Sequence, residues 1–197
     1  MPYGNLSKRE LVRILELIEL SQKCFGPEDL KKLILDSRDL FGAEFAVCGL
    51  LEPGRPVITG FVNGNYPEEW VSRYMSCNYQ GDDPVVRFHS NFAVTQLWSD
   101  VFKRYNDPKS RELLKNASDY RIKHGVTASV YVPDIDKIAV FSFSDSRDVF
   151  KDRHKKLGDI LAAHLHGALV RAISPSPAID ISESLGPERE LKEGLDG

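Results

Sequence analysis

Two pairs of short apolar segments, each pair joined by a turn, constrain the fold of this chain more than any other feature. The first pair is 45–51 and 57–62, and the second pair is 126–132 and 138–143. Both connections contain Pro, Gly or Asp, which favour turns, and apolar runs joined in this way are typical of antiparallel strands. The sequence therefore predicts an antiparallel sheet.

Segments with helical periodicity lie before, between and after these strand pairs. Ser7 and Glu10 form a capping-box pattern ahead of an apolar stripe from Leu11 to Ile18. Further helices are expected from Gly26-Pro27 to Gly42, from Pro67, from Asp107-Pro108, and over 148–172. The region from Arg87 to Val101 is expected to be less regular. Helices grouped around antiparallel strand pairs indicate an α+β fold.

Composition indicates a globular domain followed by a polar tail. The chain has 197 residues, of which 42% are hydrophobic and 28% charged, with a net charge of −3. We expect one domain over 1–173, because 174–197 is too polar to form a core and is predicted to be disordered. No apolar run is long enough for a membrane span, so a cytoplasmic location without membrane contact is expected.

The cysteines and histidines give no pattern of metal ligation. Cys24, Cys48 and Cys77 are widely spaced and odd in number, which favours reduced thiols that serve as small core residues. The five histidines lack ligand spacing. We therefore expect neither a metal nor a cofactor.

The segment from Tyr66 to Trp98 carries the residues most suited to a binding site. Tyr66 and Trp70 are spaced to share one face of a helix, and Asp83 precedes a proline, which favours an extended backbone. A carboxylate, a phenol and two indoles suit a pocket for a small amphipathic ligand. The simpler alternative is a core helix with aromatic packing, in which Asp83 caps a helix that begins ahead of Val85.

The order and spacing of these residues resemble the autoinducer-binding domain of LuxR-type quorum-sensing receptors. The matching pattern is Tyr-x3-Trp-x12-Asp-Pro, with Trp98 fifteen residues beyond Asp83. Later matches are Ala117, Gly125-Val126-Thr127 and Phe141-Ser142, so that the resemblance extends from about Leu11 to Ile173. It implies a five-stranded antiparallel sheet between helical layers, with an acyl-homoserine lactone bound between sheet and helices.

The resemblance also implies a role for each residue of the pocket. Asp83 would accept a hydrogen bond from the ligand amide, Trp70 would donate to the lactone carbonyl, and Tyr66 to the acyl carbonyl. Ser142 would donate to the same carbonyl or to a 3-substituent, and Trp98 would form a wall for the lactone ring. The residues expected to line the acyl tail of the ligand are Val47, Tyr74, Thr127 and Phe141. An unpaired Asp83 carboxylate is expected to strain the empty pocket.

The sequence departs from the family pattern at three points. Ser129 stands where proline is frequent, and Arg121 stands where glycine is usual. The family also carries a C-terminal helix-turn-helix domain, whereas only a polar tail follows residue 173 here. We therefore expect that this chain does not bind DNA itself. It would act as a homodimer or as a heterodimer with a full-length receptor, through the 148–172 helix or the Leu11–Ile18 stripe.

The residues also allow two other classes of function, an enzyme and an interaction module without a ligand. Acid–base catalysis would use Asp82, Asp83 and His89, but no nucleophile, base and orienting group are spaced for it, so the chain is not expected to be an enzyme. The second alternative is a ligand-independent interaction module that inhibits a receptor. A pocket without a ligand has no physical need for a lone carboxylate, which favours ligand binding over this alternative.

Overall fold

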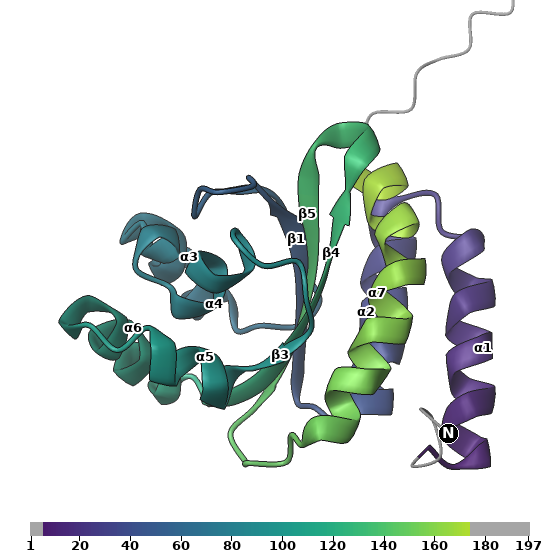
Figure 1. The fold of residues 1–197 in the computed structure, drawn as a ribbon, viewed down its shortest axis with the longest axis horizontal. Coiled ribbons are helices and arrows are strands. Elements are labelled where there is room, and N and C mark those ends of the chain that lie inside the picture. The colour runs from purple at the N-terminus through teal and green to yellow at the C-terminus, as the bar shows by residue number, and fades with distance from the viewer. Residues whose placement is uncertain (1–5, 174–197) are drawn as a thin grey trace, which may run out of the picture.

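A computed structural model describes residues 6–173 of the chain and shows three layers (Figure 1). The sheet stands in the middle, with α3, α4, α5 and α6 on one side and α1, α2 and α7 on the other. This arrangement confirms the predicted α+β fold with an antiparallel sheet between helical layers. The predicted disordered tail, 174–197, lies outside the described residues.

The bounds of the elements follow the chain in order. The helices are α1 (Lys8–Gln22), α2 (Pro27–Phe41), α3 (Glu68–Ser76), α4 (Pro84–His89), α5 (Trp98–Arg104), α6 (Pro108–Asp119) and α7 (Asp152–Ile173). The strands are β1 (Phe45–Leu51), β2 (Ile58–Asn63), β3 (Gln96–Leu97), β4 (His124–Val132) and β5 (Lys137–Asp145). The sheet has the strand order β2-β1-β5-β4-β3, and each pair of neighbours is antiparallel.

Local sequence signals set the ends of several helices as expected. The Ser7 hydroxyl accepts from the Glu10 backbone N–H, and the Glu10 carboxylate accepts from the Ser7 backbone N–H, which completes the predicted capping box of α1. Gly42 ends α2 with φ +61°, a left-handed conformation that glycine adopts without steric cost. Arg121 adopts a similar φ of +69° where the family usually has glycine.

Four local predictions were wrong. Tyr66 precedes α3 rather than lying on it, because Pro67 occupies the N-cap and the helix begins at Glu68. The region from Arg87 to Val101 holds parts of α4 and α5 as well as β3. The last helix, α7, begins at Asp152. Cys77 is exposed, whereas Cys24 and Cys48 are buried as expected.

Alternation along the strands separates the main core from the opposite face of the sheet. Phe141 and Phe143 of β5 point toward α2 and α7, where Phe143 stacks on Phe41 with ring centroids 4.1 Å apart. The apolar side of α7 is buried in the same core through Leu157, Leu161, Leu165 and Leu169. The intervening residues of β5, Val140 and Ser142, line a cavity on the other face.

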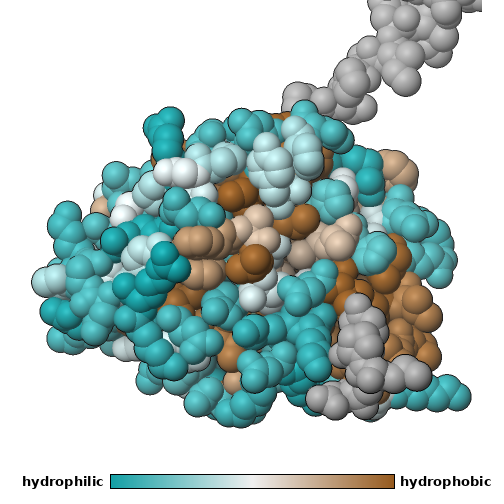
Figure 2. Space-filling view, viewed as in Figure 1, coloured by the Kyte–Doolittle hydropathy of each residue, from teal (hydrophilic) through white to brown (hydrophobic). Residues whose placement is uncertain are grey.

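The outer surface of α1 keeps apolar residues exposed. Leu11, Val12 and Leu15 are 42%, 47% and 66% exposed, and apolar atoms gather at this edge of the molecule (Figure 2). Ile14, from the same predicted stripe, is buried. Of the two dimer surfaces that the sequence suggested, the apolar side of α7 is therefore covered within the fold, and α1 remains available. None of the helices between residues 6 and 173 is both long and apolar enough to cross a membrane.

Candidate ligand-binding site

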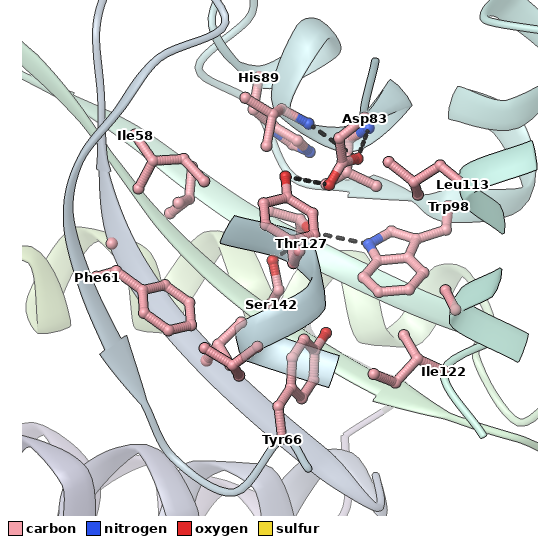
Figure 3. Close-up of a pocket in the computed structure, with 18 of the residues that line it drawn as sticks. Ile58, Phe61, Tyr66, Asp83, His89, Trp98, Leu113, Ile122, Thr127 and Ser142 are labelled. Atoms are coloured by element: carbon pink, nitrogen blue, oxygen red, sulfur yellow. Dashed lines mark hydrogen bonds between the residues drawn. The ribbon is translucent and has the colours of Figure 1, made fainter. Parts of the chain in front are cut away.

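A cavity of about 110 Å³ lies between the sheet and the layer formed by α3, α4, α5 and α6 (Figure 3). Its walls are mostly aliphatic and aromatic, with a few polar groups among them. The residues suggested by the sequence that line it are Val47, Tyr66, Trp70, Tyr74, Asp83, Trp98, Thr127 and Ser142. An apolar cavity with a few convergent polar groups is the usual form of a small-molecule site.

Phe141 does not line the cavity, contrary to the prediction. It is 1% exposed and packs in the core with α2 and α7. Successive side chains of a strand point to opposite faces, so Phe141 and its neighbour Ser142 cannot both face the cavity.

Asp83 presents its two carboxylate oxygens to different partners. The Oδ1 atom accepts from the backbone N–H of Val85 at 2.8 Å and of Val86 at 3.4 Å, which caps α4. The Oδ2 atom accepts from the Tyr74 hydroxyl at 2.9 Å. An ionised carboxylate has about four lone-pair positions, so one remains available on the Tyr74 side.

The cavity is therefore not strained by an unpaired carboxylate, contrary to our expectation. Burial raises the pKa of Asp83, while the hydrogen bonds from Tyr74, Val85 and Val86 lower it. Burial likewise raises the pKa of Tyr74 well above its usual value, which keeps the phenol protonated as a donor to Asp83. The two groups support each other without a ligand.

A chain of hydroxyl and indole groups crosses the sheet side of the cavity. The indole N–H of Trp98 donates to Thr127 Oγ1 at 2.8 Å, and Thr127 Oγ1 lies 2.8 Å from Ser142 Oγ. Thr127 and Ser142 are direct partners in the pairing of β4 with β5. These bonds fix the plane of the Trp98 ring, which forms a wall of the cavity.

Tyr66 and Trp70 keep donors that a ligand can use. The Tyr66 hydroxyl accepts from Ser144 Oγ at 3.1 Å, and burial raises the pKa of this phenol, so its proton stays in place. Trp70 lines the cavity, is only 3% exposed and carries one indole N–H donor. Both donors are suited to carbonyl oxygens.

The family model for the autoinducer binding domain matches residues 26–169. The chain belongs to this LuxR-type autoinducer-binding family. Its curated relatives include the transcriptional activator PhzR of Pseudomonas fluorescens, 33% identical over 82 residues, which are 42% of this chain and 31% of PhzR. RpaR of Rhodopseudomonas palustris, a quorum sensing-dependent regulator, is 28% identical over 82 residues, which are 41% of this chain and 33% of RpaR. The matched segment thus spans about a third of each relative.

Solved structures have the same fold as this autoinducer-binding domain. SdiA in complex with octanoyl-rac-glycerol has a TM-score of 0.66 at 22% identity, over 84% of this chain and 68% of SdiA. CepR2 of Burkholderia cenocepacia, an N-acylhomoserine lactone dependent LuxR family factor, has a TM-score of 0.63 at 18% identity, over 82% of this chain and 95% of CepR2. The relatives are regulators of transcription, and this chain is a ligand-binding domain rather than an enzyme.

Several residues that line the cavity of the autoinducer-binding domain were missed from the sequence. They include Leu51, Ile58, Val86, His89, Phe102 and Val140. Alternation with Ser142 would have placed Val140 correctly, because both lie on one face of β5. Nothing in the sequence context of His89 indicated a position in the wall of the cavity. Residues 6–173 hold no group of three or more His, Cys, Asp or Glu side chains placed to bind a metal ion.

Gly125 makes room for the wall that Trp98 forms. A Cβ atom at this position would lie 2.6 Å from two atoms of the Trp98 ring, so we expect Gly125→Ala to displace the indole from Thr127. Overpacking of this kind costs roughly 1–3 kcal/mol. Chemical denaturation and tryptophan emission should show lower stability and a changed Trp98 environment.

Gly81→Ala is the matched control, because a Cβ atom there meets nothing within 4 Å. It should change stability by no more than roughly 0.5 kcal/mol. Equal effects of the two substitutions would contradict the proposed contact between Gly125 and Trp98.

Proposed function

We propose that this domain binds an N-acyl-homoserine lactone and uses it as a signal for regulation of transcription. The observation that carries the proposal is Asp83, the single carboxylate among the described residues that line an otherwise largely apolar cavity. Its remaining lone pair suits an amide N–H, and a charge-assisted hydrogen bond in an apolar surrounding is strong.

The other polar groups have the chemistry that the rest of such a ligand requires. Trp70 donates to the lactone carbonyl, Tyr66 donates to the acyl carbonyl, and Trp98 covers the lactone ring. Ser142 reaches the same carbonyl or a 3-substituent. The acyl tail lies among the aliphatic side chains, with Val47, Tyr74 and Thr127 near its start. SdiA, solved in complex with octanoyl-rac-glycerol, and CepR2, an N-acylhomoserine lactone dependent factor, support an amphipathic acyl ligand for this domain.

We also propose that the domain acts on transcription through a second LuxR-type domain, either a copy of itself or that of a full-length receptor. The exposed apolar residues of α1 support this proposal, because a contiguous apolar patch on a surface helix is typical of a protein interface. A heterodimer with one DNA-binding partner would reduce that receptor's own binding to a palindromic operator. A domain that inhibits a receptor without any ligand is the alternative, and the binding experiments below separate the two.

Asp83→Asn should weaken ligand binding without unfolding the domain. Asparagine caps helices about as well as aspartate, so α4 should remain in place. The variant loses the charge of the acceptor, which is worth about 1.5–3 kcal/mol for a hydrogen bond to a charged group. Calorimetry with a panel of acyl-homoserine lactones measures this loss. Asp82→Asn is the control, since the Asp82 carboxylate is partly exposed near Lys109, and wild-type affinity in Asp83→Asn would contradict the role of Asp83.

The raised pKa of Asp83 gives opposite pH trends for folding and for binding. Because the folded-state pKa lies above the usual value of 3.8, the folded domain holds this proton more tightly than the unfolded chain. The contribution of Asp83 to stability therefore increases as the pH falls through the raised pKa, while ligand affinity decreases because the anionic acceptor is lost. Calorimetry over this pH range should show wild-type affinity approaching that of Asp83→Asn. A constant difference between the two proteins would contradict the assignment.

Leu15→Asp should convert a dimer of the domain into a monomer, because it places a charge in the apolar patch of α1. Light scattering coupled to size-exclusion chromatography measures the mass. Val94→Asp is the control, since Val94 is 53% exposed outside α1. A wild-type monomer at micromolar concentrations, or a dimer that Leu15→Asp leaves intact, would overturn the α1 interface.

A further inference from the structure

His89 lines the cavity, and its ring nitrogen Nε2 has no part in the ligand contacts of the proposed function. It is the last residue of α4, it lines the cavity and it is 0% exposed. Figure 3 shows it on the α4 side of the cavity, and it lies at the opposite end of α4 from the N-cap residue Asp83. Its Nδ1 atom lies 2.9 Å from Ser129 Oγ, whereas Nε2 has no hydrogen-bond partner within the described residues and is closed to solvent.

The partners of Ser129 determine which ring nitrogen carries the proton. The Ser129 hydroxyl donates to the backbone carbonyl of Val94 at 3.0 Å, and the carbonyl of Phe92 is a second, longer acceptor at 3.4 Å. Its one proton is thereby used, so Ser129 Oγ accepts from His89 Nδ1–H. Burial lowers the pKa of His89 to about 3, against a smaller opposite effect of the Phe92 carbonyl, and the ring is neutral. Nε2 is then a lone-pair acceptor without a donor.

The strand register places His89, through its partner Ser129, further along β4 than Thr127 and Ser142, which face the lactone and amide end of the ligand. Thr127 pairs with Ser142, and two residues further along β4, Ser129 pairs with Val140. Two strand residues span about 7 Å. The side chains at this level, Leu51, Val86 and Val140, are aliphatic and pack together. His89 therefore lies along the path of the tail and away from the lactone and the amide.

The other buried side-chain atom without a partner in the described residues is in a different setting. Thr95 Oγ1 packs beside Gly158 of α7 and does not line the cavity. Of these two atoms, only His89 Nε2 belongs to a residue that lines the cavity. A buried acceptor without a donor costs free energy.

We propose that the acyl tail of the ligand carries a hydroxyl group that donates to Nε2 of His89, so that the domain selects a hydroxylated tail over a plain or a keto tail. This inference rests on the proposed function. A plain tail leaves Nε2 unpaired, and a keto tail places its oxygen, which is also an acceptor, next to Nε2. A site that requires a hydroxyl rejects analogues without it, because its own polar group is left unpaired.

Calorimetry with the full chain and matched ligands tests the inference without any substitution. The ligands are N-octanoyl-homoserine lactone and its derivatives with a hydroxyl or a keto group on the fifth, sixth or seventh carbon. One hydroxyl isomer should bind the wild-type chain about tenfold more tightly than the plain ligand, and its keto counterpart should bind no better than the plain ligand. Weaker or equal binding of every hydroxyl isomer would overturn the inference and leave the proposed function standing. Failure of every ligand to bind would overturn both.

His89→Asn assigns the preference to the ring nitrogen. The asparagine amide occupies the position of Nδ1 and keeps a donor for Ser129, but it has no counterpart to Nε2. The ratio of the affinities for the hydroxyl isomer and the plain ligand should fall to about one, whatever the change in absolute affinity. A preference that persists in His89→Asn would overturn the role of His89.

Discussion

The carboxylate of Asp83 joins the helical layer to the cavity through its two oxygens. One oxygen caps α4, which places Val86 and His89 in the wall, and the other meets the Tyr74 hydroxyl. The two interpretations that the sequence left open, a helix cap and a ligand anchor, are thus compatible, because they use different lone pairs. Without the cap, the wall that follows Asp83 would lose its position together with the acceptor.

The sheet forms the wall of the cavity opposite the helical layer, because successive side chains of a strand point to opposite faces. One face of β5 carries Phe141 and Phe143 into the core with α2 and α7, and the opposite face presents Val140 and Ser142 to the cavity. The core can therefore be closely packed while the opposite face retains space for a ligand. Gly125 serves the same end on β4, because its missing side chain admits the Trp98 ring.

Local rules predicted the α+β class, and the family resemblance implied the layered arrangement and most of the site. Capping residues, turn formers and apolar periodicity indicated the strand pairs and most helices, because these signals act within a few residues. Two errors also have local reasons. Tyr66 lines the cavity as predicted but does not lie on α3, because Pro67 is the N-cap, and strand alternation directs Phe141 away from the cavity. The acceptor on His89 was not predictable, since it depends on Ser129, forty residues away in the chain.

In the proposed function, the Asp83 carboxylate accepts a hydrogen bond from the ligand amide. Solution NMR of the domain bound to an acyl-homoserine lactone labelled with nitrogen-15 at this amide observes that proton directly. A hydrogen bond to Asp83 should shift the resonance of this proton downfield and protect it from exchange with water, and the resonance should return toward its free position in Asp83→Asn. An amide proton that exchanges as in free ligand, or a shift that Asp83→Asn leaves unchanged, would contradict this hydrogen bond.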